Sequence, residues 1–475
     1  MGDLMSNLIQ KNRNSILVFI PAIITFCLVL IPTIKYSVPL GGETFYHAAL
    51  IQFFSENGIS WTKTLLWSGQ PMYSPLFDFF ILSLSKILSM GSMVILKYLQ
   101  PVFAFLIVLS FSFTAYKMYN MITGFLTGIF VMFSALFSKI MFTTPEAMIL
   151  IIMPLLAYFY VLALENKSLK YALISGMFLG FAFLTQTISA AIIFLMLTIF
   201  TLIIFIMKKE ANLKAYWILM AVSIVIAAIW WAPIFIKGSF TFQIFISPYL
   251  SQLIAINKYP EFLGIIPLIF AFIGAFYLAK RNQIKDILIL TWLLTVIILS
   301  FIQFLTTPLG AVYILALAIF PLMVMAGIGV QCIRIEGDKR PIYVLTVVIL
   351  LLGAYYGFEA ANSVQPELDS QIAVAQWFKN SGDKNLIAIS NNSSVNAAIF
   401  SISNQSVPYG SQYLKISKNL NIKKYLLGKY NTLDMINDNV GYIVLNKNVT
   451  TMPYSTVAYE NKDFKVFELN KTSIQ

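Results

Sequence analysis

The sequence is poor in the residues that build metal sites, disulfide frameworks and charged surfaces. It contains two cysteines and one histidine, and charged residues make up only 11% of its 475 positions. Cys27 and Cys332 are too few for a disulfide framework or a cysteine metal site. The single histidine, His47, excludes a site with several histidine ligands. A soluble domain of ordinary composition carries roughly 25% charged residues, so the low charge argues against a soluble globular chain.

The chain has instead a succession of long apolar runs. Hydrophobic residues make up 59% of it, and the mean hydropathy is +0.80. A run of about 18 apolar residues is long enough to cross a bilayer core. The first run is too long for a signal peptide and has no small-residue cleavage site after it, so we expect it to be retained. We predict an all-α polytopic membrane bundle with about eleven transmembrane helices, at residues 15–34, 94–116, 121–139, 147–164, 171–188, 189–207, 216–236, 262–279, 287–304, 309–333 and 341–358.

Basic residues lie mostly in alternate loops between these runs. The net charge is +12, but the basic residues form no run and no aromatic interleaving of the kind that follows a phosphate backbone, so we expect no nucleic-acid partner. The short loops near 140–146 and 305–308 contain no basic residue. Positive residues stay on the cytoplasmic side. We therefore predict a multi-pass cell-membrane protein with a cytoplasmic N-terminus, an exterior C-terminal domain and the anionic lipid of the bilayer as a partner.

This topology divides the chain into two domains. Residues 1–358 form the transmembrane domain, with a large first outer loop at 35–93 and a second at 237–261, and residues 359–475 form a small exterior α/β domain. The α/β pattern of the C-terminal domain consists of a helical period at 368–380 and strand-like runs at 386–390, 441–445 and 464–469.

One apolar segment of the first outer loop, Pro75–Met90, complicates the count. Its polar residues Asp78, Ser85 and Ser89 recur on one helical face. An interfacial helix on the outer leaflet, with this face toward water, fits that pattern and the basic loops. The alternatives are a shallow re-entrant segment or a true span, and a true span would put the basic loops outside.

Acidic residues beside hydrocarbon are costly, so those at span boundaries are candidates for function. On the predicted outer face they are Glu43, Glu56, Asp78, Glu146 and Glu261. Glu43 follows a Gly41–Gly42 turn and precedes His47 by one helical turn, so the two can act as general base and auxiliary acid. Glu43 can also simply cap the helix. Glu146, next to Pro145, can likewise be an ordinary helix-start residue.

The first outer loop contains the stretches ETFYHAALIQFFSENGISW and WSGQPMYSPLFDFF. Their order of residues resembles the C-type (GT-C) superfamily of integral membrane glycosyltransferases, which includes oligosaccharyltransferase catalytic subunits, protein mannosyltransferases and aminoarabinose transferases. The matching residues are Glu43, Tyr46, His47, Asn57, Gly58, Trp61, Gly69, Pro71, Pro75 and Leu76. Glu146 occupies the place of a second family acid at the start of a span, and the layout matches over essentially the whole chain.

The chain also departs from that pattern. The first acid is Glu rather than the commoner Asp, and the second loop has one acid where metal-dependent oligosaccharyltransferases carry Asp-x-Asp. The C-terminal domain lacks a W-W-D-Y-G sequence, and the TTPLGAVYILALAIF segment lacks the arginine that many relatives place against the lipid phosphate. A single-sugar transferase matches these departures better than an N-glycosylating oligosaccharyltransferase.

The resemblance implies transfer of a hexosyl or pentosyl group from a polyprenyl-phosphate-linked donor to an unidentified protein, lipid or glycan acceptor at the outer face. Such a reaction needs a base for the acceptor hydroxyl and a cation for the leaving phosphate. We expect Glu43, Glu146 and His47 to be catalytic, and a divalent ion (Mg or Mn) is an open option. The expected substrate-binding residues are Tyr46, Trp61, Asp78, Lys63, Lys237 and Lys258, with Lys35 a further candidate cation.

Two other classes of protein share the broad features. A lipid-linked sugar flippase or transporter usually shows internal repeats and charges at mid-membrane, and the sequence has neither a repeat nor an acid within a predicted span. A non-catalytic scaffold of the same fold would use Glu43 only as a cap.

Overall fold

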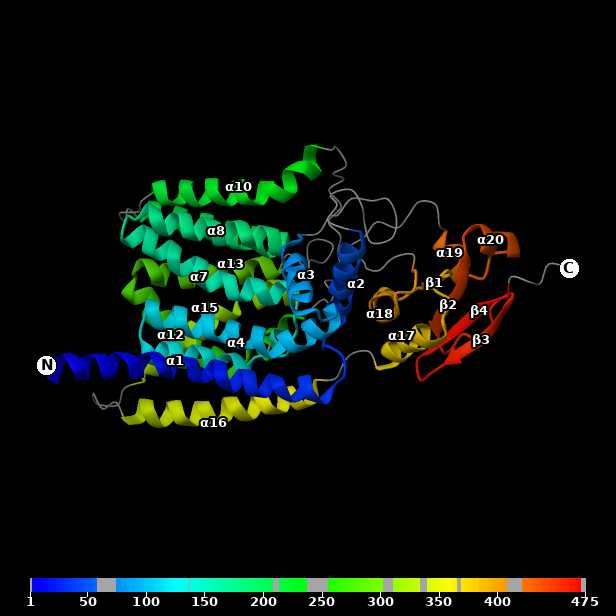
Figure 1. Cartoon of the computed structure of the whole chain (residues 1–475). Coiled ribbons are helices and arrows are strands. Elements are labelled where there is room, and N and C mark those ends of the chain that lie inside the picture. Colours follow the sequence, from blue (N-terminus) through cyan, green and yellow to red (C-terminus); the bar gives the residue numbers. More distant parts are fainter. Residues whose placement is uncertain are drawn as a thin grey trace.

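The computed structural model describes residues 2–57, 74–135, 137–207, 213–236, 255–301, 311–333, 340–364, 369–407 and 421–470. Long helices lie side by side in one bundle, and a small domain that contains a sheet lies beyond one end of it (Figure 1). The N-terminus lies at the opposite end of the bundle from this domain. The start of the chain and the small C-terminal domain are therefore separated by the length of the bundle.

The bundle consists of helices that follow the apolar runs. They are α1 (Gly2–Lys35), α4 (Ser92–Met118), α5 (Met121–Phe130), α7 (Pro145–Glu165), α8 (Leu169–Thr185), α9 (Thr187–Ile206), α10 (Leu213–Ile236), α12 (Ile265–Arg281), α13 (Ile284–Ser300), α14 (Ala311–Ala316), α15 (Ile319–Cys332) and α16 (Arg340–Ser363). Seven helical stretches of the described chain are long and apolar enough to cross a membrane, or eight if a pair bent by 91° at Gly264 counts as one span. The prediction of a polytopic helical bundle is confirmed, and a count of eleven spans is not.

The predicted continuous span at 121–139 is wrong. Helix α5 ends at Phe130, a 3₁₀ turn η1 covers Val131–Phe133, and a short helix α6 covers Phe137–Ile140. At the break, Ser134 leaves helical geometry, and its hydroxyl donates a 2.6 Å hydrogen bond to the carbonyl of Phe262. Gly264 closes the contact, because a Cβ there would lie 2.7 Å from the carbonyl oxygen of Phe133. The break therefore fits against the turn between α11 (Tyr259–Leu263), which follows η2 (Ile256–Lys258), and α12.

Two helices of the first loop lie across the end of the bundle that faces the small domain (Figure 1). They are α2 (Gly42–Asn57) and α3 (Leu76–Leu88). Helix α3 has 13 residues, which at 1.5 Å per residue gives a length of about 20 Å. A bilayer core is about 30 Å thick, so α3 is too short for the true span considered above.

The C-terminal domain has the expected α/β character. Its helices are α17 (Asp369–Ser381), α18 (Ser393–Ser403), α19 (Ile422–Leu426) and α20 (Thr432–Asn437), and its strands are β1 (Ile387–Ser390), β2 (Val440–Asn446), β3 (Ser455–Glu460) and β4 (Phe464–Leu469). The strand order is β1-β2-β4-β3, with β1 parallel to β2 and the other pairs antiparallel. Edge strand β3, which the sequence analysis did not predict, is largely exposed.

The apolar core continues from the bundle into this domain. Buried residues of α17 and α18, such as Phe378 and Val395, belong to the same cluster as Ala48 and Ile51 of α2. Helix α18 packs directly on α2. The first loop is therefore held between the bundle and the C-terminal domain.

Candidate active site

A tight turn brings the starts of α2 and α7 together. Gly41 has a φ of +86°, which L-residues rarely adopt, and a Cβ there would lie 3.0 Å from the ring of Phe142. The loop before α2 is also fixed by Gln100, whose side-chain amide donates to the carbonyl of Leu40 at 3.2 Å. The sharp turn predicted at Gly41–Gly42 is present, and glycine at position 41 lets the segment before α2 lie against the segment before α7.

Glu43 and Glu146 meet at this junction. Glu43 lies in the first turn of α2, and Glu146 lies in the first turn of α7. Glu43 follows Gly41 by two residues and Glu146 follows Phe142 by four, so the contact of Gly41 with the Phe142 ring places the two acids on neighbouring helix starts. Both side chains are partly exposed. Two of the three predicted catalytic residues therefore lie at the same junction.

Glu146 is held in place by Gln186, which the sequence analysis missed. Gln186 lies between α8 and α9 with extended backbone, and its amide donates to Oε1 of Glu146 at 2.8 Å. The hydroxyl of Ser189 donates to Oε1 of Gln186 at 2.6 Å, which fixes the orientation of the amide. Gln186 lies within the predicted span 171–188, and a polar residue inside an apolar run was the only sequence signal for this contact.

One helical turn after Glu43, His47 forms a buried hydrogen-bonded pair with Asp78 of α3. His47 Nδ1 lies 2.8 Å from Asp78 Oδ1, and the side chains are 2% and 1% exposed. The rings of Tyr46 and Phe77 pack edge-on against the imidazole, with centroids 5.0 and 5.1 Å away. The pair links α2 to α3. It fixes the orientation of the His47 imidazole, which lies on the same helix as Glu43.

The expectation that Asp78 faces water is wrong. Helical periodicity identifies residues that share a face but does not say what covers it, and here α2 and its histidine cover Asp78. Burial raises the pKa of the Asp78 carboxyl, and the charge and hydrogen bond of His47 act in the opposite direction. Among the described residues, the second oxygen of Asp78, Oδ2, has no hydrogen-bond partner. His47 is therefore the group that compensates the burial of this acid.

A lysine near the acids was overlooked because it appeared to end an apolar span. Lys139 belongs to the short helix α6, six residues before the start of α7. Its ammonium also lies 5.9 Å from the centre of the Phe142 ring. The break in the 121–139 segment thus places a cation beside the paired acids.

The structure describes two of the other predicted site residues, Lys258 and Lys35. Lys258 is exposed and forms a 3.3 Å surface ion pair with Glu261, so its contact in the structure is with the next turn of its own segment. Lys35 lies 5.1 Å from the ring of Tyr36 at the end of α1. Trp61, Lys63 and Lys237 lie outside the described residues.

The junction has limited capacity to hold a metal ion. In the part of the chain that the structure describes, histidine, cysteine and acidic residues form no group of three that could hold one. Glu43 and Glu146 provide two carboxylates. Magnesium is commonly held by one or two carboxylates together with water and substrate phosphates, so this pair fits such an ion only if substrate or water supplies the other ligands.

Comparison with known proteins gives a likeness in structure but not in sequence. No protein-family model and no curated protein matches the chain. The structure is similar to that of the archaeal oligosaccharyltransferase AglB from Archaeoglobus fulgidus, solved in complex with an inhibitory peptide and a dolichol-phosphate. The TM-score is 0.69 and the identity 12%, over 92% of this chain and 70% of that one.

Two further structures show the same likeness. ArnT from Cupriavidus metallidurans, bound to undecaprenyl phosphate, has a TM-score of 0.67 and 10% identity over 94% of this chain and 97% of that one. The arabinofuranosyltransferase AftD from Mycobacteria has a TM-score of 0.59 and 10% identity over 94% of this chain and 40% of that one. The fold expected from the resemblance of the first outer loop is therefore confirmed, because the chain shares its fold with these three glycosyltransferase structures.

Proposed function

We propose that the protein is a membrane glycosyltransferase that moves a sugar from a polyprenyl-phosphate-linked donor to an acceptor hydroxyl. The observation that carries this proposal is that three segments converge on the ring of Phe142 at one end of the bundle: the start of α2 with Glu43, the start of α7 with Glu146, and α6 with Lys139. A base and a cation in one accessible place are the two groups that this transfer needs. The fold supports the same conclusion, and two of the similar structures hold a lipid phosphate.

In this mechanism Glu43 is the general base. It accepts the proton of the acceptor hydroxyl as the acceptor oxygen attacks the anomeric carbon of the donor sugar. The bond between that carbon and the phosphate oxygen breaks, and polyprenyl phosphate leaves with the bonding electrons. Glu146 is the less suitable base, because Gln186 already donates a hydrogen bond to its carboxylate. Glu146 instead holds Lys139 and the acceptor in place.

Lys139 stabilises the leaving phosphate. The phosphate gains negative charge as the bond breaks, and an ammonium group held beside it lowers the energy of the transition state. The polyprenyl tail stays in the lipid, so the group that stabilises the phosphate must lie at the end of a membrane span. Lys139 satisfies this condition, since it lies in α6 just before span α7.

His47 acts as a positioning residue in this scheme. Asp78 fixes its ring through Nδ1, and the ring of Tyr46 packs against it. His47 follows Glu43 by one turn of α2, so the buried pair fixes the helix that presents the base. Tyr46 contributes by packing its ring against the imidazole of His47.

A Mg²⁺ or Mn²⁺ ion is the second way to neutralise the phosphate at this site. Glu43 and Glu146 would hold it, and when bound it would act as a Lewis acid on phosphate oxygens. We expect EDTA to slow transfer and added Mg²⁺ to restore it. Unchanged transfer in EDTA would mean that protein groups alone stabilise the phosphate.

Reconstitution tests the proposed function against its rivals. The full chain is placed in liposomes with a polyprenyl-phosphate sugar labelled in the sugar, and the products are separated by chain length. A transferase cleaves the donor and releases free polyprenyl phosphate, whereas a flippase moves the intact donor between leaflets and a scaffold does neither. Movement of intact donor without cleavage would overturn the proposal.

A further inference from the structure

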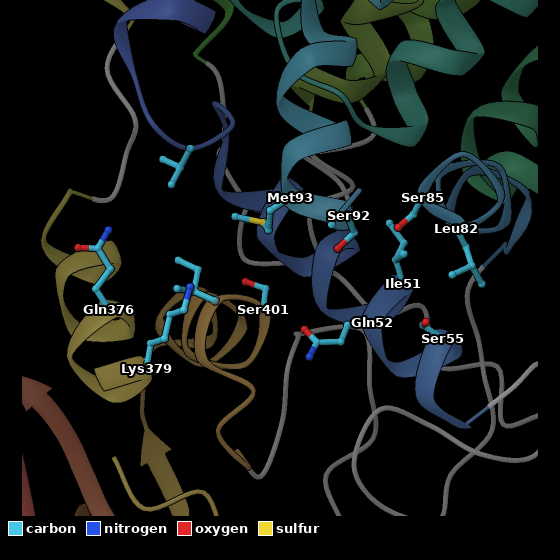
Figure 2. A pocket seen from close by; sticks show the side chains of 13 residues that line it. Ile51, Gln52, Ser55, Leu82, Ser85, Ser92, Met93, Gln376, Lys379 and Ser401 are labelled. Atoms are coloured by element: carbon cyan, nitrogen blue, oxygen red, sulfur yellow. The ribbon is translucent and has the colours of Figure 1, made fainter. Parts of the chain in front are cut away.

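A cavity lies between the helices of the first loop and the C-terminal domain. It has a volume of about 440 Å³ and is lined by residues of α2, α3, the start of α4, α17 and α18. Figure 2 shows Gln376, Lys379 and Ser401 from the C-terminal domain on one side and Gln52 and Ser55 from α2 on the other. We refer to this cavity as the interdomain cleft. Its size is in the range of pockets that bind small organic ligands.

The described lining of the interdomain cleft combines three kinds of group. Amides and hydroxyls come from Gln52, Ser55, Gln376 and Ser401, and apolar surface comes from Ile51, Leu82 and Met93. No carboxylate belongs to this lining. Neutral donors and acceptors suit the hydroxyl groups of a sugar, and the apolar side chains suit the C–H faces of its ring.

Lys379 adds a positive charge to the cleft. Its side chain is exposed, and within the described ranges it forms no ion pair. A lysine in a cleft whose described lining has no acid favours an anionic group on the ligand. We propose that the interdomain cleft binds an acidic oligosaccharide, of about two sugar units, with its acid group on Lys379.

The position of the cleft gives this ligand its role, which rests on the proposed transferase function. The first turns of α2 carry Glu43 and His47, and its last turns carry Gln52 and Ser55. Nine residues separate Glu43 from Gln52, which corresponds to about 14 Å along the helix. Residues 44–51 of α2, which lie between the two, are buried. The cleft would therefore hold two sugar units of a longer acceptor glycan at a site separate from the paired acids.

Binding of defined saccharides tests the proposal. The full chain in nanodiscs is titrated with a disaccharide of glucuronic acid and N-acetylglucosamine, with chitobiose as the neutral counterpart and glycerol phosphate as a lipid-headgroup counterpart. Saturation-transfer NMR reports contact of each probe with the protein. We expect the acidic disaccharide to bind more tightly than chitobiose, and glycerol phosphate not to displace it.

Variants locate the bound sugar. Lys379→Gln should weaken binding of the acidic disaccharide about tenfold, the effect of one lost charge-assisted hydrogen bond, and leave chitobiose binding unchanged. Ser401→Trp, which fills the cleft, should abolish binding of both. Lys462→Gln is the matched control, because Lys462 is an exposed lysine of the same domain that does not line the cleft.

The outcomes separate this proposal from the proposed function. If the acidic disaccharide fails to bind, binds equally to Lys379→Gln, or is displaced by glycerol phosphate, the saccharide site is wrong. Donor cleavage is measured in a separate liposome assay with a membrane extract as the source of the acceptor hydroxyl, so it does not depend on the disaccharide. Saccharide binding without donor cleavage would keep the cleft and reject the transferase.

Discussion

Removing Asp78 should destabilise the fold far more than removing a surface acid. The His47–Asp78 pair is almost fully buried, with a contact of 2.8 Å, and deleting one partner of such a pair costs about 3–5 kcal/mol because the other charge is left uncompensated. We therefore expect Asp78→Ala to lose about that much unfolding free energy. Asp78→Asn, which can still accept the hydrogen bond, should lose less. Equilibrium unfolding in detergent, followed by tryptophan fluorescence, measures the loss.

The chain supplies a matched control for this experiment. Glu261 pairs with Lys258 at 3.3 Å, but the two side chains are 67% and 60% exposed. Pairs of this kind contribute about 0–1 kcal/mol, so Glu261→Ala should change the unfolding free energy little. If Asp78→Ala and Glu261→Ala have equal effects, the buried pair does not hold α2 against α3, and the positioning role of His47 is refuted.

Three other predictions follow from the geometry. Gly41→Ala should cost about 1–3 kcal/mol in unfolding free energy and slow transfer. Gly91→Ala should leave stability unchanged, because Gly91 has a negative φ and no atom lies within 4 Å of its Cβ position. Equal effects of the two substitutions would contradict the role of the turn at Gly41. Lys139→Gln should lower the transfer rate at saturating donor about a hundredfold and Lys139→Arg much less; a normal rate for Lys139→Gln would remove this cation from the mechanism. In a cysteine-free background, a cysteine at Thr450 should react with an impermeant reagent on intact cells and one at Lys170 should not; the reverse pattern would invert the topology.

The sequence was sufficient for the parts of the fold that depend on local pattern. Most apolar runs form helices because hydrophobic length and helical spacing are local properties. The break at Ser134 was missed because hydropathy is continuous there. The break is stabilised by a hydrogen bond from the Ser134 hydroxyl to the carbonyl of Phe262, 128 residues away. Strand β3 was missed because it is a largely exposed edge strand without a clear apolar alternation.

The candidate site was likewise predicted where it depends on local pattern and missed where it depends on tertiary contacts. Glu43 and His47 were predicted together because they are one turn apart on one helix. The pairing of His47 with Asp78, the contact of Gln186 with Glu146 and the approach of Lys139 all depend on how helices pack. Such tertiary contacts join residues with no local relation, so composition and spacing did not predict them.

The most direct test of the central claim is the transfer rate of Glu43→Gln. Gln keeps the size of Glu and can still form a helix-end hydrogen bond, so the fold should be retained. Loss of the general base should lower sugar transfer from the polyprenyl-phosphate donor by about two to four orders of magnitude. His47→Ala should lower it less, and Glu261→Gln should have no effect. A near-normal rate for Glu43→Gln in folded protein would make Glu43 a helix cap and contradict the account.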